Sequence, residues 1–173
     1  QGPEDFELVL DRYLIVSSGF HKPLFQKGDH EGALFLYDLE TNRERDYKFN
    51  FPFNPHGIHS VKVKGDTFQI AAINHRPGRD TIEVFNFFPK QMKLLHIKTI
   101  ENKLFVNLND LIFYKDAFYI TRDHYFANNV GLFIENFARL PLGSIIRWTK
   151  DGVKEVASAL RFPNGIINNN GDI

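Results

Sequence analysis

Short apolar runs alternate with tight polar turns along most of the chain. In residues 61–64 apolar and polar side chains alternate with a period of two, which is typical of a half-buried β-strand. Two β-prone runs around a short polar turn predict a β-hairpin. The predicted hairpins pair residues 6–10 with 13–17, 59–64 with 68–74, 81–87 with 94–100, 111–114 with 118–121, and 144–149 with 153–157, and a further run covers 33–39. The pattern therefore predicts an all-β fold.

One segment has the periodicity of a helix instead. Residues 131–140 (GLFIENFARL) form a stretch in which apolar positions recur at helical spacing. The residues that would share one face of this helix are Leu132, Phe133, Asn136 and Leu140. We therefore expect a single helix within an otherwise β-rich chain.

The repetition of hairpins every few tens of residues bears on the architecture. A β-propeller blade is a four-stranded sheet of about 40–50 residues. The chain would then form a single domain over residues 1–173, with about three to four such blades. A sandwich or barrel of short strands is the alternative. The polar motifs described below favour the propeller, because they recur where strands meet turns, and a propeller gathers such junctions around one central channel.

Composition excludes several classes of protein. Hydrophobic residues make up 43% of the chain and 18 residues are Phe, as expected for a β-rich core. The formal net charge is zero and the Lys and Arg residues are scattered, so nothing indicates a nucleic-acid partner. No apolar run approaches the roughly 20 residues that a bilayer-spanning helix needs.

The absence of cysteine narrows the possible chemistry. A chain without Cys has no disulfide, no Cys-based zinc site and no thiol nucleophile. The sequence also lacks a Gly-x-Ser-x-Gly elbow, a His-Glu-x-x-His motif and a P-loop, which disfavours covalent serine catalysis. The chain begins at Gln1 without an initiator Met or a signal peptide, so we expect it to be a fragment of a longer protein.

Two pairs of polar residues interrupt the apolar pattern and are candidate metal ligands. Glu4 and Asp5 precede the run 6–10, and adjacent side chains on an extended backbone point to opposite sides, so the pair can reach two different cations. A solvated acidic turn is the alternative, and these two residues alone favour it. Asn109 and Asp110 lie between leucines, where polar groups are costly unless they are paired or bind a metal. A β-turn is an equally good interpretation of this second pair.

Asn164 and two histidines complete the set of candidates. Asn164 lies in a Pro-Asn-Gly turn, and on its own it indicates only that turn. His56 and His75 lie at strand edges beside turn residues, and two neutral imidazoles in contact allow one to act as a base while the other takes up the proton. His124 is either a hydrogen-bonding group behind the site or a strand end. Calcium prefers carboxylate and amide oxygens, so these residues together suggest a calcium-dependent hydrolase.

The motifs, in this order, resemble those of the paraoxonase/arylesterase family. The strongest are residues 53–58 (FNPHGI), 95–100 (LHIKTI), 107–110 (NLND) and 123–126 (DHYF). The resemblance covers nearly the whole chain, from Gly2 to Ile166. It implies a six-bladed β-propeller with two calcium ions in its central tunnel, of which this chain would supply about the first three to four blades.

The resemblance also assigns roles to the candidate residues. The implied calcium ligands are Glu4, Asp5, Ile58 through its backbone carbonyl, Asn109, Asp110 and Asn164. Of these, Glu4, Asn109 and Asn164 would bind the catalytic ion, and the others would bind the structural ion. His56 would act as the general base, assisted by His75. The family's later Asp-Asn ligand pair is not in this chain.

The implied activity is hydrolysis of small-molecule aryl esters and lactones, in a protein that is secreted or held in the secretory-pathway lumen. Calcium would polarise the carbonyl while His56 activates water. Association with lipid or a membrane surface, through regions outside this chain, also belongs to what the resemblance implies. One alternative is a non-catalytic paraoxonase-like propeller that acts as a chaperone or scaffold for membrane proteins. Another is a sugar-lactone hydrolase with one metal, against which the second ligand pair, Asp5 and Asp110, argues.

Overall fold

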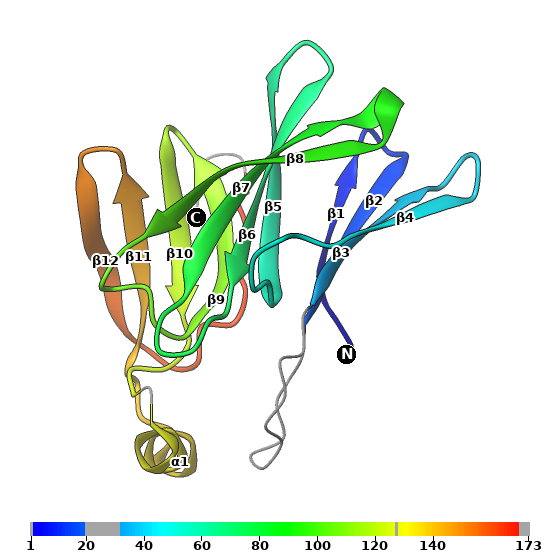
Figure 1. Ribbon diagram of the computed structural model, residues 1–173. Coiled ribbons are helices and arrows are strands. Elements are labelled where there is room, and N and C mark those ends of the chain that lie inside the picture. Colours follow the sequence, from blue (N-terminus) through cyan, green and yellow to red (C-terminus); the bar gives the residue numbers. More distant parts are fainter. Residues whose placement is uncertain (1, 20–31, 127, 170–173) are drawn as a thin grey trace.

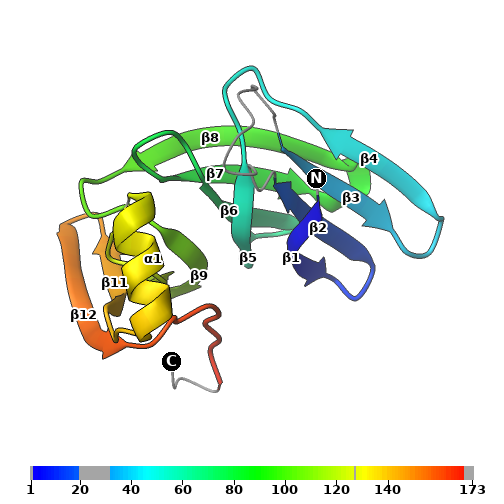
Figure 2. The same cartoon turned by 90° about the horizontal axis from the view of Figure 1, so that it is seen from below.

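The computed structural model describes residues 2–19, 32–126 and 128–169. It contains three four-stranded antiparallel sheets, each made of four strands that follow one another in sequence order. Figure 1 shows these sheets side by side, and Figure 2 shows that they form an arc. The predicted all-β fold is therefore confirmed. Four-stranded meanders of this kind have the form of propeller blades, and the described residues supply three of them, at the lower end of the predicted number.

Each sheet carries one inner strand, at the hollow side of the arc, and three strands that follow it outward. The first sheet contains β1 (Gly2–Val9), β2 (Tyr13–Gly19), β3 (Ala33–Asp38) and β4 (Arg43–Tyr47). The second contains β5 (Pro55–Lys64), β6 (Thr67–Asn74), β7 (Thr81–Phe88) and β8 (Lys93–Glu101). The third contains β9 (Leu108–Tyr114), β10 (Ala117–Arg122), β11 (Gly143–Thr149) and β12 (Gly152–Leu160). The inner strand β5 contacts both β1 and β9, so the inner strands of all three sheets lie side by side.

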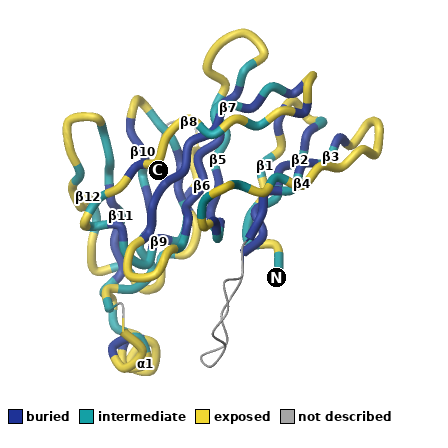
Figure 3. The backbone as a smooth tube through the Cα atoms, in the orientation of Figure 1, coloured by how far each residue is buried: buried dark blue, intermediate teal, exposed yellow. Residues whose placement is uncertain are grey.

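Two apolar clusters hold neighbouring sheets together. The first lies between the first and second sheets and includes Leu36, Ile70 and Phe85. The second lies between the second and third sheets and includes Ile82 and Ile120. Strands β6 and β7 contribute to both clusters, because alternate residues of a strand face opposite sides of the sheet. Strands β6 and β7 are therefore largely buried (Figure 3), which explains the nearly continuous apolar runs in these two strands.

The predicted helix is present but lies two residues earlier at both ends, so Leu140 is outside it. Helix α1 spans Asn129–Ala138, and the side-chain oxygen of Asn128 accepts a hydrogen bond from the Gly131 amide at 2.8 Å, which caps its first turn. Its buried residues are Gly131 and Glu135, whereas Phe133 is 68% exposed. In the ranges that the structure describes, no helix has the length and apolarity required to cross a membrane.

Candidate functional site

The inner strands depart from regular pairing where the candidate residues lie. The register shifts lie between Pro3 and Asp5 in β1, between Pro55 and Ile58 in β5, and between Ile120 and Arg122 in β10, opposite residues 108–111 of β9. Bulges of this kind bend a strand and re-aim its side chains, and they are common next to active sites. As a result Glu4 and Asp5, although adjacent in β1, both line the same cavity.

That cavity gathers residues from all three sheets. It has a volume of about 300 Å³ and is lined by Glu4, Asp5, His56, Gly57, Asn109, Asp110, Asn164 and Gly165. Every predicted side-chain ligand of calcium is among them. Asn109 and Asp110 belong to strand β9, so the β-turn interpretation of this pair is wrong. Asn164 follows β12 in an irregular segment, which is not the turn that its Pro-Asn-Gly sequence predicts.

Two carboxylates of the cavity are fixed by backbone amides. Asp5 accepts hydrogen bonds from the amides of Phe6 at 2.7 Å and Ile58 at 2.8 Å. Asp110 accepts hydrogen bonds from the amides of Leu111 at 2.7 Å and Ile166 at 2.9 Å. Each carboxylate is therefore tied both to its own strand and to a distant segment, so its oxygens hold a set position in the cavity.

The same two carboxylates are held in an environment that disfavours their negative charge. Burial raises the pKa of Asp110 to about 6; the two amide hydrogen bonds oppose this shift, and the nearby charge of Asp5 adds to it. Burial also raises the pKa of Asp5 above its ordinary value, and the hydrogen bonds from the Ile58 and Phe6 amides oppose this shift. A divalent cation placed between such carboxylates reverses this effect, because it stabilises their ionised forms.

The donor atoms of the cavity fit a hard cation such as calcium. They are carboxylate and amide oxygens, whereas zinc favours nitrogen and sulfur ligands in a closed tetrahedron. Among the described residues, no group of three or more His, Cys, Asp or Glu side chains could hold a metal ion by itself. A calcium site here therefore depends on the Asn109 and Asn164 amides and on backbone oxygens, all of which calcium accepts. Ile58 is 2% exposed and its amide donates a hydrogen bond to Asp5. The ligand role of its carbonyl stays a prediction.

The two candidate histidines lie in contact at the edge of this cavity. The ring centroids of His56 and His75 are 5.0 Å apart, with the rings tilted by 49°. Nδ1 of His56 lies 3.3 Å from a carboxylate oxygen of Glu4, and Nδ1 of His75 lies 2.9 Å from Oδ1 of Asp80. Burial alone would lower the pKa of His75, but the hydrogen bond and charge of Asp80 raise it above its ordinary value. The pair that the sequence predicted is thus assembled, with a carboxylate beside each ring.

Comparison with known proteins agrees with the motifs and the fold. A model of the arylesterase family matches residues 1–172. The chain belongs to the arylesterase family. It is 31% identical to serum paraoxonase/arylesterase 2 of Gallus gallus and 32% identical to serum paraoxonase/lactonase 3 of Oryctolagus cuniculus, over 95% of this chain and 49% of each relative. Human serum paraoxonase/lactonase 3 is 31% identical with the same coverage. This arylesterase-family chain therefore spans about half the length of the curated relatives it matches.

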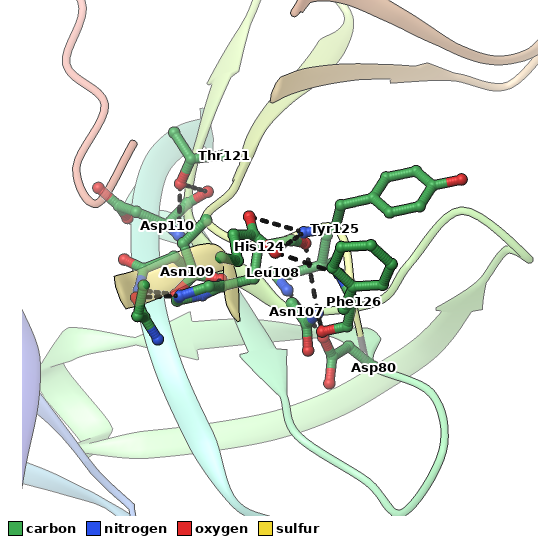
Figure 4. Close-up of polar contacts among 12 residues, drawn as sticks. Asp80, Asn107, Leu108, Asn109, Asp110, Thr121, His124, Tyr125 and Phe126 are labelled. Carbon is green, nitrogen blue, oxygen red and sulfur yellow. Dashed lines mark hydrogen bonds and ion pairs between the residues drawn. The ribbon is translucent and has the colours of Figure 1, made fainter. Parts of the chain in front are cut away.

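Behind the cavity of this arylesterase-family chain, two of its motifs are joined by hydrogen bonds. Asn107, with a left-handed φ of 53°, donates from its side chain to the carbonyls of His124 at 3.2 Å and Phe126 at 2.8 Å (Figure 4). Asp123 lies 3.0 Å from Nδ1 of His124 and 3.5 Å from the Asn109 amide. The prediction that His124 is a hydrogen-bonding group behind the site agrees with this arrangement, since it reaches Asn109 through Asp123.

The structure also shows supporting residues that sequence reasoning missed. The Thr121 hydroxyl accepts a hydrogen bond from the Asp110 amide at 2.9 Å, and the two residues are drawn together in Figure 4. The Ser17 hydroxyl accepts a hydrogen bond from the amide of Asp5 and donates one to the carbonyl of His56. These two bonds join the first two sheets at the cavity. Asp80 was missed as well. Ser17 and Thr121 carry no local signal, because their partners lie on other strands. Asp80 contacts both His75, five residues before it, and the Leu108 amide of the next sheet.

Proposed function

We propose that the protein is a calcium-dependent hydrolase of aryl esters and lactones. The observation that carries this proposal is one cavity in which Glu4, Asp110 and Asn109 present oxygens beside His56. The names of the matched relatives, arylesterase and lactonase, support the same substrate class. The substrates would be small molecules that reach the cavity from the hollow side of the arc.

Two calcium ions are proposed, held by different residues. Glu4, Asn109 and Asn164 would hold the catalytic ion, and Asp5, Asp110 and the Ile58 carbonyl would hold the structural ion. Calcium bound at the catalytic position would act as a Lewis acid, which polarises the substrate carbonyl and stabilises negative charge on its oxygen. The amide hydrogen bonds to Asp5 and Asp110 keep their oxygens in place before any ion arrives.

The histidines would handle the proton. His56 lines the cavity and would take a proton from the attacking water, whose oxygen forms a bond to the carbonyl carbon. His75, in ring contact with His56, would share the proton and return it. The ester C–O bond then breaks, and the proton goes to the leaving oxygen. The products are the carboxylic acid and the alcohol or phenol, or the hydroxy acid from a lactone.

The main alternative is a non-catalytic scaffold that keeps calcium for stability. Such a protein needs Asp5 and Asp110, but it has no use for two imidazoles in contact, each beside a carboxylate. The histidine pair therefore favours the hydrolase. Secretion and lipid association, both implied by the family resemblance alone, remain proposals that await measurement on the whole protein.

The proposal is tested by kinetics on the protein in its natural full length. Hydrolysis of phenyl acetate and of a lactone is measured with calcium and with a calcium chelator, beside the variants Glu4→Gln and His56→Gln. We expect activity to be lost with chelator and with Glu4→Gln, and to fall about 10²–10⁴-fold with His56→Gln. Asp66→Asn, which removes an exposed carboxylate on a hairpin turn, is the matched control. A folded, calcium-binding protein without turnover on any ester or lactone would instead support the scaffold.

A further inference from the structure

Asp80 is a buried carboxylate that joins the second sheet to the third. It is 6% exposed and lies in the loop between β6 and β7. Its Oδ2 accepts a hydrogen bond from the amide of Leu108 at 2.8 Å, and its own amide donates to the carbonyl of Phe105 at 3.0 Å. Leu108 is the first residue of β9, directly before Asn109. Asp80 is thereby held against the strand that carries the predicted calcium ligands (Figure 4).

The other oxygen of Asp80 is directed at His75. Oδ1 lies 2.9 Å from Nδ1 of His75, and in the described part of the chain this histidine is the basic side chain paired with Asp80. The two arginines of the same loop are engaged elsewhere, since Arg76 and Arg79 pair with Glu101 at 3.7 and 3.1 Å. The carboxylate charge is therefore available to His75.

The chemistry of this contact fixes the proton on the imidazole ring. A carboxylate only accepts hydrogen bonds, so Nδ1 of His75 must carry the proton that it donates to Asp80. A neutral imidazole has one protonated nitrogen, so Nε2 of His75 is then an acceptor. Nδ1 of His56 likewise faces a carboxylate, that of Glu4. Nε2 of His75 is therefore the nitrogen through which this ring would exchange a proton with its neighbour.

We propose that Asp80 is a positioning residue for the histidine pair: by accepting the Nδ1 proton of His75, it keeps Nε2 of that ring as the proton acceptor. Asp80 does not touch the cavity, and it acts through His75 and through the position of β9. The catalytic part of this inference rests on the proposed hydrolase function, whereas the tautomer of His75 does not.

The first arm of the test reads the tautomer directly in the full-length protein. NMR of the protein labelled with ¹⁵N in its histidines shows which ring nitrogen carries the proton. The spectra are recorded at alkaline pH, where His75 is neutral and has a single ring proton on nitrogen. We expect the Nδ1–H form in the wild-type protein. Asp80→Asn keeps the size of the side chain and its bond from the Leu108 amide, but it presents an NH₂ group to Nδ1. The proton should therefore move to Nε2. A wild-type His75 in the Nε2–H form, or an unchanged tautomer in Asp80→Asn, would overturn the proposal.

The second arm separates positioning from a merely structural role. Asp80→Asn should lower kcat about 10²-fold or more, as loss of a proton acceptor does, while KM and calcium affinity stay within about twofold because the ligands are untouched. Asp66→Asn serves as the control and should leave kcat, KM and calcium affinity unchanged. A changed tautomer with unchanged kcat would overturn the catalytic part of the proposal. A loss of kcat that is explained by weaker calcium binding would overturn it as well. If the wild-type protein hydrolyses no ester or lactone, the proposed function fails while the NMR result still decides the role of Asp80.

Discussion

A methyl group on Gly57 would lie 2.6 Å from the Cα atom of Asp110. The inner strands β5 and β9 therefore meet through bare backbone at the edge of the cavity. The same methyl carbon would lie 2.6 Å from the Asn109 carbonyl oxygen, so no movement of one flexible side chain relieves the contact. Glycine is required here by close approach of two strands.

Gly57→Ala should consequently push β5 away from β9 and disturb the proposed calcium site. We expect calcium affinity to fall about 10-fold or more, comparable to the loss of a group that supports metal ligands. Isothermal titration calorimetry on the full-length protein measures this. Gly2→Ala is the control, because a methyl group on Gly2 meets no atom within 4 Å. Equal calcium affinity in the two variants would show that the approach of the strands does not set the ligand geometry.

Calcium removal should destabilise the protein, because Asp5 and Asp110 then lose their counter-charge. A ligand present at 100 times its Kd adds about 2.7 kcal/mol to the free energy of unfolding, so a chelator should lower the Tm of the full-length protein. Differential scanning calorimetry with and without chelator measures the difference. The Asp110→Asn variant should lose most of this difference in Tm. Asp116→Asn, which changes an exposed carboxylate in a turn, should keep the difference. A wild-type Tm that does not respond to chelator would contradict the metal site.

Much of the fold was predictable because local signals agreed with the final structure. The hairpins were found since their apolar runs and turns are contiguous in sequence. Strand β4 was missed because its residues, RERDY, are polar and lie at the exposed edge of the first sheet, where backbone pairing with β3 holds them. The beginnings of β5 and β9 were missed as well. There His56, Asn109 and Asp110 interrupt the apolar pattern, as functional residues do.

The site was predictable in its members but less so in its geometry. The ligand types and the histidine pair followed from the motifs and their order. The bulges that bring Glu4 and Asp5 to one cavity do not appear in the sequence, because a register shift depends on pairing with β2. Asp80 illustrates the same limit. Its position depends in part on a hydrogen bond from the amide of Leu108, 28 residues further along the chain and on another sheet.

Phe85 should be among the residues whose loss costs most stability. It is 0% exposed, and its ring lies 4.8 Å from the centroid of Phe49 and 5.9 Å from that of Phe53, between the first two sheets. Phe85→Ala should lower the free energy of unfolding by about 3–5 kcal/mol, since it leaves a large cavity. The change is measured by denaturant unfolding followed through Trp148 fluorescence. Phe133→Ala, at a 68% exposed ring on α1, should cost far less, and an equal cost at both positions would contradict this account of the core.

Glu83 is a buried carboxylate in the middle sheet that should make stability depend on pH. It is 1% exposed, and the groups that contact it are His96 at 2.9 Å, Thr99 at 2.6 Å, Thr81 at 2.7 Å and Asn74 at 3.1 Å. Burial alone would raise the pKa of Glu83, but these hydrogen bonds lower it below its ordinary value. A carboxyl whose pKa is lowered by folding stabilises the folded state above its unfolded pKa, and that contribution is lost as the pH falls through the folded pKa.

Glu83→Gln should therefore be less stable than the wild-type protein at pH 7, and the difference in Tm should shrink as the pH falls below the ordinary glutamate pKa of about 4.3. Thermal unfolding from pH 7 to pH 3 measures both. Glu101→Gln removes an exposed carboxylate of the next strand, β8, and is expected to change Tm little. Asn74, which donates to Glu83, also accepts a hydrogen bond from the amide of Asn54 at 2.8 Å. Asn54 lies two residues before His56. Loss of the Glu83 carboxylate should therefore loosen the segment that leads into the cavity. A constant difference in Tm across this pH range would mean that shape, and not the charge of Glu83, stabilises the middle sheet.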